Sequence, residues 1–474
     1  MSLIRFSPLD KLNVEGYNFP RQRGCLAGRT RRVEALPLKI PVFPNTMRPV
    51  TFIHAADIHL GRPFSGLRTS RPALGDLCLR AGYLAWERII RTALDEHADF
   101  VTLGGDVFDG PNPPLKARLA FKEGIEALHE AGMPVFMALG NHDPLDSFPE
   151  NLRQMPGLHI FGPAPSGASP DLPELRGNVV VYGASFPTSV VKENLARGFR
   201  REPGVTLAIG LLHANVSGMT GHDDYAPCSL HDLRASGMDA WCLGHVHRQG
   251  VLCQEPLVLY SGVSQAAHVN EAGLGACAVV SVEPHSRPVA RFVPVAPVLW
   301  DRMEMDVSDL GTDEEVVCAV EEKCISLLQG HQDAEALVVR ISLVGHRDSR
   351  RHRDPDVMEE LSETLSERLE KLSPPVFLES LRDGTRAAVD LDTLARQEGV
   401  LGDFLRLTRS ASSDPELVED LLRDLEAELS KRQWKRHLAA DVNPQHWRDD
   451  PHALEETLLE AQRLVASMFL DEAS

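Results

Sequence analysis

Residues 50–59 read VTFIHAADIH, a short apolar run that ends in Asp57 and His59. The run has the length of a buried strand, and the polar pair follows where that strand would end. In an extended segment, residues i and i+2 point the same way, so Asp57 and His59 could face one metal ion together. The stretch therefore predicts a buried strand with a pair of metal ligands at its carboxyl end.

Four more segments repeat this plan further along the chain. Each places polar donors after an apolar run, and they are Gly105-Asp106, Gly140-Asn141-His142-Asp143, His213 and Gly244-His245-Val246-His247. Together with the first pair they offer oxygen and imidazole donors but no thiolate, a mixture that suits Mn, Fe or Zn rather than Ca. Glycines that permit tight turns and close backbone approach stand beside the donors at Gly104, Gly105, Gly140 and Gly244.

Each segment also has a plainer interpretation when it is taken alone. Asp106 could cap a helix or a turn, and Asn141 could be an ordinary turn residue. His213 could be a hydrogen-bonded histidine of the core. All five segments in this order, each after an apolar run, favour a shared site instead. Because two ions about 3.5–4 Å apart can clamp a phosphate, the residues predict a two-metal phosphoesterase in which Asp106 bridges the ions.

Short apolar runs alternate with helical patterns over 49–297. The runs lie at 50–56, 100–104, 135–140, 179–183, 206–212, 240–243 and 257–261, and the helical patterns lie at 73–96 and 114–131. This layout predicts an α/β domain in layers, with functional side chains on the loops that leave the strand ends. The expected fold is a layered β-sandwich flanked by helices.

Two further regions follow this domain. Residues 298–388 predict a small α/β unit, with strands at 298–306, 336–344 and 375–381 and helices at 312–328 and 354–371. Residues 389–474 predict a helical C-terminal region. Leucines from Leu417 to Leu429 form an apolar stripe after Pro415, and a second stripe follows Pro451. Such stripes must pack on something, either on each other or the preceding unit, or on a partner protein.

The first 48 residues carry more Lys and Arg than Asp and Glu and lack the apolar core of a signal peptide. We expect a disordered extension there. A start codon assigned ahead of Met47, or a basic arm that touches DNA, would give the same composition.

The bulk composition narrows the class of protein. The 474 residues are 43% hydrophobic and 25% charged, and no apolar run reaches the length that a membrane helix needs. The eight cysteines form no CxxC pair, which fits a reducing cytoplasm. A net charge of −19 argues against coating nucleic acid by charge alone. It leaves room for a DNA enzyme, because bound metal ions supply local positive charge.

The five segments resemble the motifs of the calcineurin-like metallophosphoesterase superfamily. Residues 52–282 further resemble its bacterial DNA-repair exonuclease branch, the SbcD-like and YhaO-like proteins. The resemblance rests on HAADIHLG, GGDVFDGPNPP, ALGNHDP, LLHANV, HDDYAPCSLHDL, WCLGHVHR and YSGVSQAAHVNEAG. It implies that the unit at 298–388 is the capping domain of that family.

The resemblance also implies roles for the site residues. One metal ion would be held by Asp57, His59, Asp106 and His247, and the second by Asp106, Asn141, His213 and His245. The ions would be Mn²⁺, His142 would be the catalytic imidazole, and Asp143 would orient it. Some relatives have a histidine shortly after the Gly-Asp aspartate, where this chain has Asp109. His268, in the last quoted motif, either reaches the site or lies on the surface.

The function that these observations favour is a metal-dependent nuclease acting on DNA phosphodiesters, the exonuclease subunit of a repair complex with an SMC-like ATPase. The alternative is a phosphoesterase for a smaller, nucleotide-type substrate, because the metal centre alone presents the same chemistry to both. A scaffold without catalysis is disfavoured, since every expected ligand is present. A homodimer is compatible with this interpretation, and a membrane association is not expected.

Overall fold

The computed structural model describes residues 48–64, 72–170, 179–217, 224–347, 355–387 and 391–411, with short helical pieces between 418 and 469. All of them belong to one compact unit, Phe43–Ser474. The N-terminal extension expected at 1–48 lies outside the described residues except for Arg48. Most of the helices expected after Pro415 and Pro451 lie outside them too.

The first sheet has six strands in the order β12-β11-β1-β2-β3-β4. Its strands are β1 (Val50–Ala55), β2 (Phe100–Leu103), β3 (Val135–Met137), β4 (Leu158–Ile160), β11 (Ala276–Val282) and β12 (Val289–Pro294). The four strands from β1 to β4 run parallel, so their carboxyl ends share one edge of the sheet. Strands β11 and β12 add an antiparallel hairpin beside β1 that the sequence pattern did not predict.

The second sheet also has six strands, in the order β5-β6-β7-β8-β10-β9. They are β5 (Ser166–Ala168), β6 (Val179–Ala184), β7 (Leu207–His213), β8 (Ala240–Gly244), β9 (Gly250–Gln254) and β10 (Leu257–Tyr260). Strands β6, β7, β8 and β10 are parallel. The carboxyl ends of β7 and β8 therefore also share one edge.

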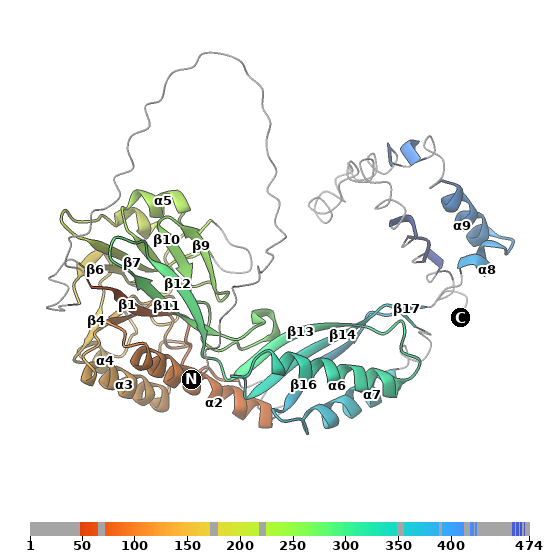
Figure 1. Cartoon of the computed structure of the whole chain (residues 1–474), viewed down its shortest axis with the longest axis horizontal. Helices are drawn as coiled ribbons and strands as arrows, with labels where there is room; N and C mark the ends of the chain where they lie inside the picture. The colour runs from red at the N-terminus through yellow and green to blue at the C-terminus, as the bar shows by residue number, and fades with distance from the viewer. Residues whose placement is uncertain are drawn as a thin grey trace, which may run out of the picture. The chain divides into compact units, whose positions relative to one another are not determined.

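The two sheets pack face to face, and alternate residues of each strand explain the layers. Phe52 and Phe100 point into the core between the sheets, whereas their neighbours Ile53 and Val101 point to the other face of the first sheet. Helices cover that outer face, and they are α2 (Pro72–Asp95), α3 (Leu115–Glu130) and α4 (Glu150–Arg153). The 3-10 helix η2 (Leu195–Gly198) and helix α5 (Leu230–Ala235) lie on the second sheet (Figure 1). The layered sandwich expected from the sequence is confirmed.

His54 joins the two sheets through the core. It is fully buried, its Nδ1 lies 3.1 Å from Oγ1 of Thr102 on β2, and its Nε2 lies 3.0 Å from the carbonyl oxygen of Leu243 on β8. Burial lowers the pKa of His54 to about 4, which keeps the ring neutral near pH 7. The imidazole thus serves as a structural link between the two sheets.

A smaller three-stranded sheet follows in the order β13-β14-β16. Its parallel strands are β13 (Val298–Asp306), β14 (Ala336–Val344) and β16 (Val376–Asp383), and its helices are α6 (Asp313–Gln329) and α7 (Pro355–Leu369). Apolar residues of the helices pack on one face of the sheet. The βαβαβ order expected from the sequence is therefore present, with a two-stranded ladder of β15 (His346–Arg347) and β17 (Arg386–Ala387) added.

The described end of the chain is helical. Helices α8 (Leu391–Ala395) and α9 (Val400–Ala411) pack together, and Ala466 is buried in the same small cluster as Leu405. Ala466 therefore packs in the cluster of α8 and α9, a contact that was not among the options considered for the apolar stripe. Within the described residues, no helix is both long and apolar enough to cross a membrane.

The packing at Gly244 gives the first prediction. A Cβ at Gly244 would lie 2.2 Å from the carbonyl oxygen of Gly104, so Gly244→Ala forces the two sheets apart. We expect it to lower the free energy of unfolding by about 1–3 kcal/mol, measured by denaturant titration. Gly82→Ala is the matched control, because a Cβ there, in helix α2, meets no atom within 4 Å. Equal stability of the two variants would contradict the close approach.

Candidate metal centre

The five polar segments lie together where the strand ends of both sheets meet. Asp57 and His59 follow β1, Asp106 follows β2, and the 140–143 segment follows β3. His213 ends β7, and His245 and His247 follow β8. Donors that are up to 190 positions apart in the chain are thereby gathered, because parallel strands bring their carboxyl ends to one edge.

The backbone at the donors is unusual. Four donor residues have positive φ angles, and these are Asp57 (50°), His59 (48°), Asp106 (52°) and His245 (97°). This left-handed region is costly for residues other than glycine and is found where the surrounding structure imposes it. The segment 57–59 is thus not extended, and the donor atoms of Asp57 and His59 come together through this left-handed backbone, not through the alternation of a strand.

Hydrogen bonds to the next loop hold this conformation. The backbone N–H of Asp57 donates to the carbonyl oxygen of Gly105, and that of His59 donates to the carbonyl oxygen of Asp106, both at 3.0 Å. The two loops therefore continue the parallel pairing of β1 and β2 beyond the strands. They aim the side chains of Asp57 and Asp106 into the same buried space.

One group of donors consists of Asp57, His59 and His247, whose donor atoms lie within 4.8 Å of one another. Nε2 of His247 lies 3.4 Å from Nε2 of His59 and 3.9 Å from Oδ1 of Asp57. Both oxygens of Asp57 also accept the backbone N–H of His245, at 3.1 and 3.0 Å. Three donors from two sheets thus face one point.

A second group consists of Asp57, Asp106 and His213. Nδ1–H of His213 donates to the carbonyl oxygen of Gly104 at 2.9 Å. Its Nε2 then has only a lone pair to present, 3.0 Å from Oδ1 of Asn141 and 3.4 Å from Oδ2 of Asp106. Three electron-pair donors converge there, which is favourable only when a cation or an additional proton lies between them. The residues therefore fit a metal ion.

His245 is tied to this second group by its ring as well as by its backbone. The ring centroid lies 5.2 Å from that of His213 and 5.6 Å from that of Tyr225. All seven residues expected to bind metal thus lie at one site, and His142 is beside them with its ring centroid 4.8 Å from that of His59.

His142 is held by a contact that sequence reasoning did not foresee. Its Nδ1–H donates to the backbone carbonyl of Asp109 at 3.1 Å, and its backbone N–H donates to Oδ1 of Asp106 at 2.9 Å. The ring is half-buried, and its Nε2 is left as the atom that can exchange a proton with a substrate.

Asp143 acts on the backbone and not on the ring of His142. Its Oδ1 accepts the N–H groups of Asp106 and Gly140, and its Oδ2 accepts those of Val107 and Phe108. Burial and the neighbouring Asp106 raise the pKa of Asp143 to about 6, against these hydrogen bonds. Asp143 therefore acts on the orientation of His142 indirectly, through the backbone N–H groups that its carboxylate holds.

Electrostatics at the site favour bound cations. Asp57 and Asp106 are both buried, and two like charges in a low-dielectric space repel. Burial raises the pKa of Asp57, although His213, His247 and His59 oppose this effect. For Asp106, burial also acts to raise the pKa, but His213, His59 and His142 outweigh it and the pKa is lowered. The imidazoles thus partly offset the repulsion between the two buried carboxylates, and bound divalent ions would offset it more fully.

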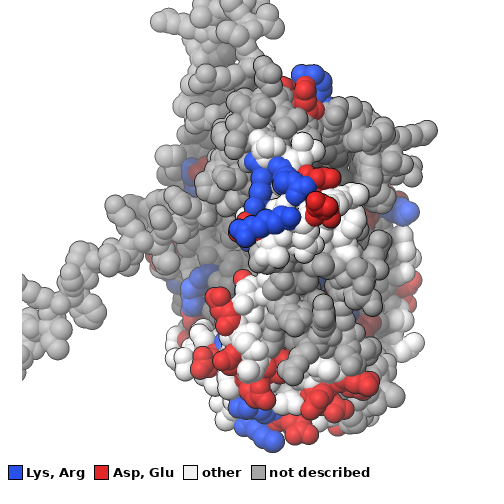
Figure 2. Space-filling view, turned by 90° about the vertical axis from the view of Figure 1, so that its right-hand side faces the viewer, with Lys and Arg blue, Asp and Glu red and all other residues white. Residues whose placement is uncertain are grey.

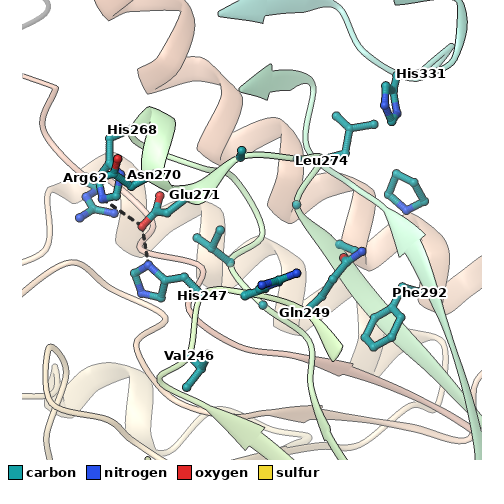
Figure 3. Close-up of a pocket in the computed structure, with 18 residues that line it drawn as sticks. Arg62, Val246, His247, Gln249, His268, Asn270, Glu271, Leu274, Phe292 and His331 are labelled. Carbon is teal, nitrogen blue, oxygen red and sulfur yellow. Dashed lines mark hydrogen bonds and ion pairs between the residues drawn. The ribbon is translucent and has the colours of Figure 1, made fainter. Parts of the chain in front are cut away.

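A cavity of about 1510 Å³ opens beside His247 (Figure 3). Polar side chains line it, among them Arg62, Arg248 and His268. Nε of Arg62 lies 3.4 Å from Oδ1 of Asp109, and that oxygen lies 3.2 Å from Nδ1 of His59. The cavity therefore connects the donor groups to basic side chains.

Glu271 also lines the cavity and was missed from the sequence. It ends the 3-10 helix η3 (Val269–Glu271), and its Oε1 lies 2.5 Å from Nδ1 of His247. Burial acts to raise the pKa of Glu271, but the hydrogen bond and charge of His247 outweigh it and lower the pKa to about 2. The only sequence signal was its place in the 260–273 motif, three residues after His268.

Comparison with known proteins identifies the fold and the type of centre. Residues 50–249 match the family model described as calcineurin-like phosphoesterase. The chain carries a calcineurin-like phosphoesterase domain. Residues 300–386 match the model described as the middle domain of the metallophosphoesterase YhaO. The calcineurin-like family uses a dinuclear metal site, for which candidate ligands are present in this domain.

Three curated relatives show where the chain stands in this family. It is 36% identical over 261 residues to the uncharacterized metallophosphoesterase YhaO of Bacillus subtilis, covering 55% of this chain and 64% of that protein. It is 28% identical to the DNA double-strand break repair protein Mre11 of Sulfurisphaera tokodaii, covering 43% and 51%. It is 27% identical to a subunit of the nuclease SbcCD of Bacillus subtilis, covering 47% and 63%. The chain thus spans between half and two thirds of the length of these relatives.

The converging donors give the second prediction. Adding Mn²⁺ to metal-free protein should raise the Tm, because ions that bind only the folded state stabilise it, by about 2.7 kcal/mol per site at 100 times Kd. A chelator should reverse the rise, as followed by scanning calorimetry. Asp57→Asn should lose most of the rise, since its carboxylate belongs to both groups. An undiminished rise in that variant would count against this site.

Proposed function

We propose that this chain is a metal-dependent phosphodiesterase that acts on DNA. The observation that carries the proposal is the convergence of Asp57, Asp106 and the imidazoles of His59, His213 and His247 beside His142. The names of two relatives point to DNA repair and to a nuclease, and these names supply the substrate class. The free thiols of the seven described cysteines suit a reducing cytoplasm.

We assign each residue of the site either to metal binding or to proton transfer. Asp57, His59, Asp106 and His247 would hold one ion, and Asp106, Asn141, His213 and His245 would hold the other. The two ions, which we propose to be Mn²⁺, would supply Lewis acidity toward the phosphoryl oxygens. Because Nδ1–H of His142 is engaged by the carbonyl oxygen of Asp109, Nε2 would give a proton to the departing oxygen.

Charge on the protein surface bears on how DNA would be held. The chain has a net charge of −19, and on the face shown in Figure 2 a small group of Lys and Arg lies among acidic side chains. The coloured residues of that face form no broad basic surface. We therefore propose that the DNA backbone is held near the ions and by Arg62 and Arg248 of the cavity.

The third prediction tests the substrate and the role of His142. Purified protein with Mn²⁺ should degrade end-labelled linear DNA and also hydrolyse bis-p-nitrophenyl phosphate. His142→Ala should keep its bound metal but lose about 10²–10⁴-fold in rate on both substrates, since it removes a general acid. His231→Ala, at an exposed histidine of α5, is the control and should keep full rate.

Two results would contradict the proposal in different ways. Hydrolysis of the small ester without any action on DNA would favour a small nucleotide-type substrate. Full activity of His142→Ala on DNA would remove the role given to that imidazole.

We also propose an SMC-like ATPase as partner, attached through the helical C-terminal region. The name of one relative describes it as a subunit of a nuclease. Helix α9 exposes Val400 (74%) and Leu407 (57%) outside its small cluster, and such side chains can dock on a partner.

The fourth prediction follows from this attachment. A chain that ends at residue 387 keeps every strand from β1 to β17 and loses α8 and α9. It should hydrolyse the small ester at nearly the rate of the full chain but fail to associate with the ATPase in a pull-down. Retained association, or loss of small-ester activity, would indicate that the region is structural.

A further inference from the structure

Glu271 belongs to none of the converging donor groups, yet its carboxylate is well buried beside one of them. Its side chain is 6% exposed. One oxygen lies 2.5 Å from Nδ1 of His247 and 3.4 Å from Nε2 of His268. The other accepts the backbone N–H of Ala267 at 2.8 Å. Figure 3 shows the carboxylate between the two histidine rings, at the wall of the cavity.

The contact with Glu271 determines which nitrogen of His247 carries the proton. A carboxylate accepts, so Nδ1 of His247 must donate, and the proton of the neutral ring is held there. Nε2 then presents its lone pair toward Nε2 of His59, at 3.4 Å, and toward Oδ1 of Asp57, at 3.9 Å. The ring orientation and the tautomer are therefore both those that a metal ligand needs.

The segment that carries Glu271 is itself anchored. The backbone N–H of Glu271 donates to the carbonyl oxygen of His268 at 2.9 Å, which closes the turn of η3. Nε of Arg302, on β13, donates to the carbonyl oxygen of Val269 at 3.2 Å. The carboxylate is thus presented by a braced turn.

Asp109 offers an instructive contrast at the other imidazole of the group. Its carboxylate lies 3.2 Å from Nδ1 of His59, but the same oxygen is shared with Arg62 and the side chain is 22% exposed. Because its contact is shorter and its burial deeper, Glu271 constrains the ring of His247 more strongly than Asp109 constrains the ring of His59.

We propose that Glu271 is a positioning residue for His247, which fixes the tautomer and orientation of that ring for a divalent metal ion without binding the ion itself. This inference rests on the metal-dependent function proposed above. A carboxylate behind a histidine ligand orients the ring and raises its basicity, and losing such a partner typically weakens metal binding about 10–100-fold.

The test is metal binding by the full chain, with Mn²⁺ as the probe. Calorimetric titration and metal content should give two sites in the wild type. Glu271→Ala should weaken one site about 10–100-fold and leave the other unchanged, whereas His247→Ala should abolish that one site. Glu271→Gln should lie between wild type and Glu271→Ala, because its amide oxygen can still accept from Nδ1–H but carries no charge.

Asp239→Asn is the matched control. Asp239 is also a partly buried carboxylate that accepts a backbone N–H, from Ala208 at 2.8 Å, and it precedes β8 at the end opposite His245. It should lower the Tm of the metal-free protein without changing the affinity of either site. The Tm of metal-free Glu271→Ala separates a local effect on His247 from a general loss of stability.

Three results would overturn the proposal. Wild-type affinity at both sites in Glu271→Ala would show that His247 needs no positioning. Equal weakening of both sites together with a lowered metal-free Tm would show a general loosening of the fold. Loss of the site in Glu271→Gln as complete as in His247→Ala would show that Glu271 is a ligand. A wild type that binds no Mn²⁺ would instead reject the proposed function, and this inference with it.

Discussion

The ends of strands β2 and β8 approach so closely that no side chain fits between them, and the site depends on this approach. A Cβ on Gly244 would lie 2.2 Å from the carbonyl oxygen of Gly104, and one on Gly140 would lie 2.2 Å from Oδ1 of Asp106. Because the strand ends can meet there, donors from both sheets converge. A side chain on Gly244 would hold the two sheets apart, and one on Gly140 would displace the carboxylate of Asp106.

The second constraint is electrostatic. Nδ1–H of His213 donates to the carbonyl oxygen of Gly104, and Nδ1–H of His247 donates to the carboxylate of Glu271. Each ring then turns a lone pair toward carboxylate oxygens in a buried space. Lone pairs and carboxylates repel one another unless positive charge lies between them. The hydrogen bonds at Nδ1 therefore leave Nε2 of each ring available to bind a cation.

The sequence predicted the sandwich and the gathering of the donors, because both follow from polar residues placed at the ends of apolar runs. It could not predict that Asp57 and His59 adopt left-handed backbone, since this depends on hydrogen bonds to the loop at 105–106, over 40 positions away. Glu271 was missed for a similar reason: its significance lies in a contact with His247, which its place in the 260–273 motif does not reveal. The hairpin of β11 and β12 was missed, and the leucine stripe after Pro415 lies largely outside the described residues.

The left-handed backbone also bears on how such a site would decay in evolution. Each of Asp57, His59, Asp106 and His245 bears strain that costs about 1–3 kcal/mol and that glycine would relieve. A descendant that no longer needed the donors would gain stability at once by replacing them with glycine, so abandonment of catalysis would leave a recognisable trace. This chain retains a donor at every one of the four positions. At each of them a side chain that offers a metal-binding atom thus stands where glycine would be less strained.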